Sequence, residues 1–309
     1  MDNYYISFAP LQGYTDAVYR NTHHKHCGGV DEYYTPFVRI EKGEPRRKDV
    51  RDINPTICDG TPTVPQIIAA SRDEFAQLCD TVQALGWKRI DINMGCPFPL
   101  QVKAGRGCGL LAHPDEVERI ALEIQKRKEV VFSVKMRLGQ NNSTEGLDIL
   151  PILNDLPLLH ITLHPRLGKQ QYRGAPDYDA FATFIENCGH KVVYNGDITT
   201  KEQADRIMKE YPKLKGVMIG RGLLSKPWLL SDNEPISMIK AMHGDIYKHA
   251  CKNLCGDSQI LSRMHAFWEY IDIDKKIHKA IMKSGSLRRY EEALAMLSTT
   301  KGVTTTGKN

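Results

Sequence analysis

The sequence lacks several features that characterise other classes of protein. Its eight cysteines include no CxxC pair, which argues against both a disulfide framework and a zinc ribbon. No apolar run approaches the roughly 20 residues needed to cross a bilayer. The opening string MDNYYISFAP also lacks the basic and apolar stretches of a secretory signal. We therefore expect a cytoplasmic protein with reduced thiols and no membrane-spanning segment.

Two short motifs fall short of the sites that they suggest. His23, His24, His26 and Cys27 could be metal ligands, and His23 and Cys27 would share a helix face. No carboxylate or second cluster completes a metal coordination shell, so a solvated or core-edge helix is the preferred interpretation. The string GRGCG at residues 105–109 does not have the GxGxxG spacing of a dinucleotide-binding turn. The sequence predicts neither a metal site nor a Rossmann fold.

The excess positive charge lies at the end of the chain. The 309 residues carry a formal net charge of +5, and residues 236–309 contain 12 Lys and Arg against 7 Asp and Glu. The preceding residues contain 30 of each kind. This pattern is expected if the last quarter of the chain contacts a polyanion, and a chance distribution is the alternative.

Eight short apolar segments alternate with helix-like stretches, which is typical of βαβ units around a parallel sheet. The intervening helices begin with capping residues such as Ser71, and Thr199 or Thr200. We therefore predict a TIM (β/α)8 barrel over residues 1–235. The eight strands are expected to begin at Tyr5, Glu32, Val64, Arg89, Val130, Leu159, Lys191 and Gly216.

Residues 236–309 show helical periodicity and no strand pattern. Apolar residues between Ile260 and Ile271 recur at spacings of three and four, which predicts one buried helix face. We expect a small α-helical bundle that forms a second domain. Its surface would carry a basic stripe, for which the plain alternative is a solvated helix face: Lys275, Lys276, Lys279, Lys283, Arg288 and Arg289.

Polar groups follow nearly every predicted strand, where the working residues of a TIM barrel lie. The loops after strands seven and eight, the usual phosphate site of this fold, contain Gly196, Gly220, Arg221 and Gly222. Ordinary turn glycines are the alternative. The other strand-end groups are Gln66, Asn93, Lys135, Arg137, His164, Arg166, Asn195 and Asp197.

Cys96 directly follows the fourth predicted strand, between Gly95 and Pro97. A cysteine in such an exposed turn can act as a nucleophile or a general acid. Cys108 is the competing candidate, and the strand-end position favours Cys96.

The strings APLQGYTDAVYR, DINMGCP, VKMRLG, HPRLGKQQYRGAPDY, NGDI and GVMIGRGLLSKPW closely resemble those of the tRNA-dihydrouridine synthases of bacterial type. The resemblance covers roughly residues 5–230. It implies an FMN- and NADPH-dependent enzyme that reduces the C5=C6 bond of specific uridines in tRNA, with Cys96 as general acid to C5 and a hydride from reduced FMN to C6.

The resemblance also assigns residues to the cofactor and the substrate. The uracil would face Asn93, Arg137 and Arg166, with Lys135 also near it, and residues 236–309 would bind tRNA. FMN would be held by Ala9, Pro10, Leu11, Gln66, Lys135, His164, Asn195, Gly196, Asp197, Gly220 and Arg221. After the sixth strand the family usually has a small residue followed by Arg-Thr, whereas this sequence has Pro165, Arg166 and Leu167. The missing Thr leaves one contact with phosphate or backbone unassigned.

A basic segment between the second and third predicted strands offers a second tRNA contact, since phosphate contacts supply much of the affinity for nucleic acids. It contains Lys42, Arg46, Arg47, Lys48 and Arg51. With the helical domain's Lys275, Lys279, Lys283 and Arg288, this segment is our hypothesis for the tRNA surface.

Two other functions are compatible with parts of the pattern. The first is an FMN-dependent barrel oxidoreductase acting on a free pyrimidine or an enone, which needs no basic appendix. The second is a non-catalytic RNA-binding or folding factor, which needs no thiol at a strand end. The sequence does not predict which uridine is reduced, and a monomer is the default expectation.

Overall fold

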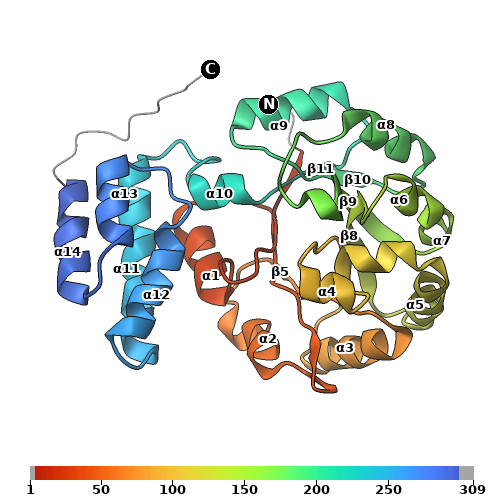
Figure 1. Ribbon diagram of the computed structural model, residues 1–309, viewed down its shortest axis with the longest axis horizontal. Helices are drawn as coiled ribbons and strands as arrows, with labels where there is room; N and C mark the ends of the chain where they lie inside the picture. The colour runs from red at the N-terminus through yellow and green to blue at the C-terminus, as the bar shows by residue number, and fades with distance from the viewer. Residues whose placement is uncertain (1–3, 299–309) are drawn as a thin grey trace.

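The computed structural model describes residues 4–298, and a closed parallel barrel dominates it (Figure 1). The large sheet has the order β5-β2-β1-β11-β10-β9-β8-β7-β6, and every neighbouring pair in it is parallel. Its strands are β1 (Tyr5–Phe8), β2 (Glu32–Tyr34), β5 (Thr63–Val64), β6 (Gln66–Ile67), β7 (Arg89–Met94), β8 (Val131–Gly139), β9 (Leu158–Leu167), β10 (Val192–Tyr194) and β11 (Gly216–Ile219).

Strands β5 and β6 are two halves of one barrel strand, separated by Pro65. Proline has no N–H to donate to a ladder, but its carbonyl still accepts from the Asp91 N–H at 2.8 Å. β5 pairs with β2 and β6 pairs with β7, so the sheet closes through the proline. The predicted TIM barrel is confirmed, with all eight predicted strands present.

Helices cover the outside of the barrel. The side chain of Ser71 accepts from the Glu74 N–H, and Thr200 forms a capping box with Gln203, so both predicted caps are present. The barrel helices are α1 (Ala17–His26), α2 (Arg47–Asp52), α3 (Arg72–Ala84), α4 (Pro99–Lys103), α5 (Pro114–Lys126), α6 (Thr144–Asp148), α7 (Leu150–Asn154), α8 (Tyr178–Asn187), α9 (Lys201–Glu210) and α10 (Arg221–Ser225).

Three elements differ from the sequence prediction. The strings VVFSVKM and LHITLH predict strands that end at Met136 and His164. β8 and β9 extend to Gly139 and Leu167, because the two strands continue to pair beyond the rim of the barrel. The basic segment after β2 forms an antiparallel hairpin of β3 (Ile40–Glu41) and β4 (Glu44–Pro45). Its alternation was too short to be recognised in the sequence.

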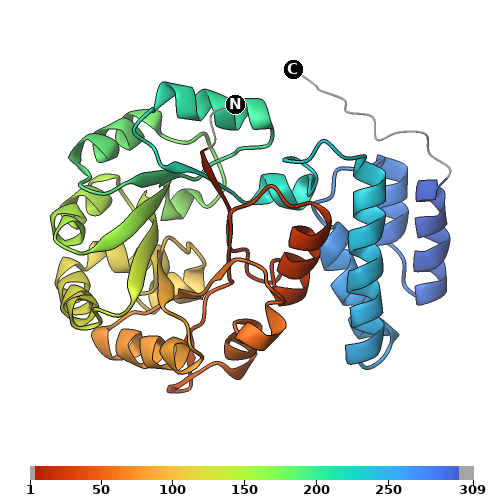
Figure 2. The same cartoon turned by 180° about the vertical axis from the view of Figure 1, so that it is seen from behind.

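In the described chain four helices follow the barrel, and α11 and α12 lie beside α1 (Figures 1 and 2). They are α11 (Pro235–Asn253), α12 (Asp257–Trp268), α13 (Lys275–Met282) and α14 (Leu287–Ala295). Asp245 on α11 accepts from Lys25 at 2.7 Å, and Arg263 on α12 reaches Asp16 at 2.7 Å. Within residues 4–298, no helix is long and apolar enough to span a membrane.

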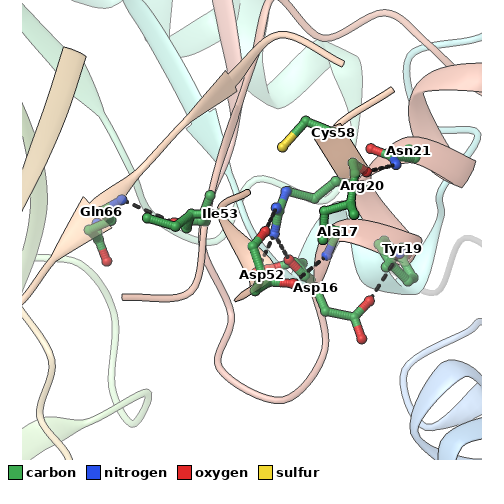
Figure 3. A network of polar contacts seen from close by, with 12 residues as sticks. Asp16, Ala17, Tyr19, Arg20, Asn21, Asp52, Ile53, Cys58 and Gln66 are labelled. Carbon is green, nitrogen blue, oxygen red and sulfur yellow. Dashed lines mark hydrogen bonds and ion pairs between the residues drawn. The ribbon is translucent and has the colours of Figure 1, made fainter. Parts of the chain in front are cut away.

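A buried arginine holds the loop after β1 (Figure 3). Arg20 is 1% exposed; its guanidinium donates to the Thr15 carbonyl at 2.8 Å and to the Asp52 carboxylate at 2.9 Å. The same carboxylate accepts from the Ala17 N–H at 2.7 Å. The interaction therefore ties the first loop of the barrel rim to the end of α2.

We expect Arg20→Leu to lower the free energy of unfolding by about 3 kcal/mol, because it leaves the Asp52 carboxylate partly buried without its cation. Urea unfolding followed by circular dichroism would measure the loss. The matched control is Arg119→Leu, which removes a side chain that is 59% exposed in its pair with Glu116, and its effect should stay within about 0.5 kcal/mol. Equal effects of the two variants would contradict this role for Arg20.

Candidate functional site

A cavity of about 850 Å³ opens at the carboxyl ends of the strands. TIM barrels bind their ligands at this end. Of the residues predicted for cofactor, acid and substrate, all but Arg166 line this cavity. They are Ala9, Pro10, Leu11, Gln66, Asn93, Cys96, Lys135, Arg137, His164, Asn195, Gly196, Asp197, Gly220 and Arg221.

Cys96 lies in a turn anchored by the preceding strand. The Asn93 side-chain oxygen accepts from the N–H groups of Gly95 and Cys96 at 3.0 and 2.8 Å. Burial raises the pKa of the Cys96 thiol, although the Phe98 backbone and the nearby arginines and Lys135 oppose the shift. The thiol therefore keeps its proton at neutral pH.

Cys108 lies behind this turn and does not line the cavity. Its sulfur is 3.2 Å from the Cys96 carbonyl oxygen and 2.8 Å from the Gln140 side-chain oxygen. Of the two candidate cysteines, only Cys96 borders the space where a ligand could bind.

Two cations and a neutral imidazole share the cavity with Cys96. Burial lowers the pKa of Lys135 to about 8, and Arg137 adds to this effect while Asp91 opposes it. Burial also holds the pKa of His164 well below its ordinary value, helped by the surrounding cations. His164 is therefore neutral at pH 7, and within residues 4–298 no protein group accepts a hydrogen bond from the Lys135 ammonium.

The Arg137 guanidinium forms hydrogen bonds to backbone carbonyls in the cavity wall. It donates to the carbonyls of Gly95 at 3.0 Å, Leu167 at 3.1 Å and Gln171 at 2.7 Å. It thus links the Cys96 turn to the loop after β9, and its Nη2 group has no such carbonyl partner in the described part of the chain.

Arg166 is the predicted substrate residue that the fold does not bring to the cavity. It lies on the extended part of β9 and is 1% exposed. Its guanidinium contacts the His164 ring nitrogen at 3.1 Å, pairs with Asp197 and donates to the Gly174 carbonyl. Arg166 therefore supports two residues that line the cavity, His164 and Asp197, and its direct contact with the substrate stays a prediction.

The loops after β10 and β11 present unused backbone donors. In the described chain, the N–H groups of Gly196, Asp197 and Gly220 have no hydrogen-bond acceptor. A side chain at Gly222 would collide with the Ile198 carbonyl, so the close approach of these loops requires glycine there. The position is suited to an anionic group.

Asp197 adds a carboxylate to the same loops. Burial opposes its ionisation, but hydrogen bonds and charge from Arg166 and Arg221 outweigh burial and hold the pKa of Asp197 below its ordinary value. Its negative charge is thus matched by two guanidinium groups, one behind the wall and one beside the cavity.

Aromatic side chains that the sequence analysis did not single out surround the mouth. The Tyr172 ring lies 4.3 Å from the Arg221 guanidinium and 5.6 Å from that of Arg137. Tyr270 comes from the helical region, directly after α12, and packs edge-on against Tyr14 at 5.1 Å between ring centres. Tyr172 could have been predicted as a cavity residue, because it is an aromatic residue in a loop that follows a barrel strand. No local sequence pattern indicates that Tyr270 reaches the cavity. The aromatic residues that line the cavity are Tyr14, Phe37, Phe98, Tyr172 and Tyr270.

The basic residues predicted to contact tRNA lie on two surfaces. Lys42 and Arg47 are exposed on the hairpin and at the start of α2, whereas Arg46 pairs with Glu41 and Asp49. The helical region exposes the others, of which Arg288 lies 3.8 Å from Glu292. They are Lys275, Lys279, Lys283 and Arg288.

The chain is similar in sequence to several known proteins. The chain is 32% identical over 165 residues to tRNA-dihydrouridine synthase B of Pasteurella multocida, covering 53% of this chain and 49% of that protein. It is 28% identical over 227 residues to tRNA-dihydrouridine synthase B of Shewanella oneidensis, covering 72% and 69%. It is 27% identical over 232 residues to tRNA-dihydrouridine(16) synthase of Aquipseudomonas alcaligenes, covering 72% and 73%.

The matched segment thus spans about half the length of the first relative and over two thirds of the other two. A family model described as dihydrouridine synthase (Dus) matches residues 7–304, which is nearly the whole chain. The resemblance found in the sequence motifs is confirmed, and the chain belongs to the dihydrouridine synthase family.

Proposed function

We propose that this protein is an FMN-dependent tRNA-dihydrouridine synthase that reduces the C5=C6 bond of uridine in tRNA, with NADPH as the source of electrons. The observation that carries the proposal is the shared cavity of a protonated thiol, Cys96, and a partly buried cation, Lys135. A binding protein needs no such pair. The names of the relatives support tRNA as the substrate.

The residues present fit FMN. The unused N–H groups of the loops after β10 and β11, together with Arg221, would hold the phosphate. The Lys135 ammonium, which lacks a protein acceptor in the described residues, matches an electron-rich ring edge. Ala9, Pro10 and Leu11 would pack against the ring, with Gln66 at its polar edge. Bound and reduced, FMN would supply the hydride that C6 of the uracil receives.

The protein's own groups account for the proton and the charge. Cys96 holds its proton at the sulfur and can release it to C5 as a general acid. Charge that develops on the uracil carbonyls is stabilised by cations and donors held rigidly in a buried site, here Lys135, the free edge of Arg137 and the Asn93 amide. The target base must leave its stack to reach this depth, and the aromatic rim offers surfaces on which neighbouring bases can stack.

Replacing the thiol should stop the reaction without emptying the site. We expect Cys96→Ser to lower kcat for tRNA reduction by about 10²- to 10⁴-fold, the usual contribution of a general acid, while the visible absorption of bound flavin is retained. Cys251→Ala, on the exposed end of α11, is the matched control. Activity would be measured as the dihydrouridine that each purified variant forms in unmodified tRNA with NADPH, by mass spectrometry of the nucleosides. Full activity of Cys96→Ser would show that Cys96 is not the general acid.

The same assay with free uridine tests the rival small-molecule function. Turnover of uridine at a rate matching that of tRNA would favour an oxidoreductase of free pyrimidines.

The pH profile should report Lys135. Its pKa of about 8 means that the ammonium is charged below this pH and loses its charge as the pH rises through it. The pKa of Cys96 is raised above its ordinary value, so the thiol is still protonated in this range. We expect kcat to fall above about pH 8. The Lys135→Arg variant stays charged over this range, so its residual kcat should not fall above about pH 8. If kcat of this variant still falls there, another group causes the decrease.

The basic hairpin should contribute to tRNA affinity. Neutralising Lys42 and Arg47 together, as Lys42→Gln and Arg47→Gln, is expected to weaken tRNA binding and to reduce the slope of log Kd against log salt by about 1 for each phosphate that the variant no longer neutralises. Lys209→Gln with Lys213→Gln removes the same charge from α9 and the following loop, and should leave the slope unchanged. Equal slopes for both double variants, measured by filter binding, would exclude the hairpin from the tRNA surface.

A further inference from the structure

The proposed chemistry leaves one buried carboxylate unused. Asp91 is fully buried on β7, in register with Gln66 on one side and with Ser133 on the other. The Gln66 amide nitrogen donates to one carboxylate oxygen at 2.6 Å, and the Ser133 hydroxyl donates to the other at 2.6 Å. Burial raises the pKa of Asp91 to about 7, and the hydrogen bonds from Ser133 and Gln66 and the positive charge of Lys135 and Arg89 oppose this shift.

A continuous chain of hydrogen bonds connects Asp91 to the turn that carries Cys96. The Gln66 side-chain oxygen accepts from the Asn93 amide nitrogen at 2.7 Å. The Asn93 oxygen in turn accepts from the N–H groups of Gly95 and Cys96 at 3.0 and 2.8 Å. Two side-chain amides therefore lie between the carboxylate and the backbone of the thiol.

The two ends of this chain determine the orientation of both amides. A backbone N–H can only donate, so the oxygen of Asn93 must face the Cys96 turn. Above its pKa of about 7 the Asp91 carboxylate can only accept, so the nitrogen of Gln66 must face it. With both ends fixed, Gln66 and Asn93 can exchange only the bond that is observed, and each amide nitrogen keeps one further hydrogen. Both residues line the cavity, which makes these hydrogens available to a carbonyl group of a ligand.

We propose that Asp91 is a positioning residue that, through Gln66 and Asn93, holds the Cys96 turn and presents the two amides to the cavity as hydrogen-bond donors. Asp91 does not touch the ligand. The role of Cys96 as proton donor rests on the function proposed above, whereas the orientation of the turn does not.

Asp91→Asn tests the proposal, because asparagine keeps the shape and loses the fixed polarity. Its amide can face Gln66 with either atom, and Ser133 can donate or accept, so both amide orientations become possible. In the reversed orientation the Asn93 nitrogen meets the N–H groups of the turn, which loosens it. We expect Cys96 to react with iodoacetamide about tenfold faster than in the wild type, the equivalent of one lost buried hydrogen bond.

Alkylation would be followed on the purified holoprotein by mass spectrometry of the tryptic peptide 90–103, in which Cys96 is the only cysteine. Thr162→Val is the matched control, since it removes a buried hydroxyl of β9 that has no partner among the described residues, and it should alkylate at the wild-type rate. A wild-type rate in Asp91→Asn would overturn the proposal. The readout needs no tRNA and no turnover, so its result does not depend on whether the proposed reaction is correct.

A double variant distinguishes a positioning role from general damage. In Asp91→Asn with Asn93→Asp the carboxylate moves to the other end of the chain, and every bond can form in the reverse direction. The carboxylate now at position 93 accepts from the turn and from Gln66, whose oxygen accepts from the amide now at position 91. We expect the wild-type alkylation rate to return, even if the single variant does not fold. A double variant that alkylates as fast as Asp91→Asn, or that fails to fold, would contradict the proposal.

Discussion

The structure depends on the pairing of the first barrel strand with the last. Residues Tyr5 to Phe8 of β1 lie in register with Gly216 to Ile219 of β11, and a side chain at Gly216 would collide with the Tyr5 carbonyl. Because this pairing closes a parallel sheet, all strands must end at the same rim. The convergence of the thiol, the cations and the donor loops on one cavity is a consequence of this closure.

Much of the fold could be predicted because its signals are local. Each barrel strand is a short apolar run bounded by turn residues, and the caps at Ser71 and Thr200 are decided by the neighbouring residues alone. The extension of β8 and β9 could not be predicted in this way, because it results from pairing between the two strands and not from the composition of either. The same holds for the short hairpin of β3 and β4.

The site was predictable where a side chain's direction follows from strand alternation, as for Gln66 and Lys135. Arg166 shows the limit of such reasoning. Its position after a strand predicted a residue that lines the cavity. Its partners, Asp197 and the Gly174 carbonyl, come from loops whose course depends on the folded state, and they hold the Arg166 side chain inside the cavity wall. Tyr270 reaches the cavity from a region that the sequence assigned to tRNA binding alone.

The contribution of Tyr270 has a consequence for the order of assembly. The Tyr14 hydroxyl on the first loop donates to Glu269 at 2.9 Å, and the Asp272 N–H donates to the Ser225 carbonyl at 2.9 Å. Contacts between residues so distant in the chain form late, because loop-closure entropy opposes them until most of the structure is present. On the ribosome, the strand-end groups can gather once β11 has emerged, but the mouth stays unfinished until α12 has followed. A nascent chain would thus assemble the strand-end groups before it completed the mouth of the cavity.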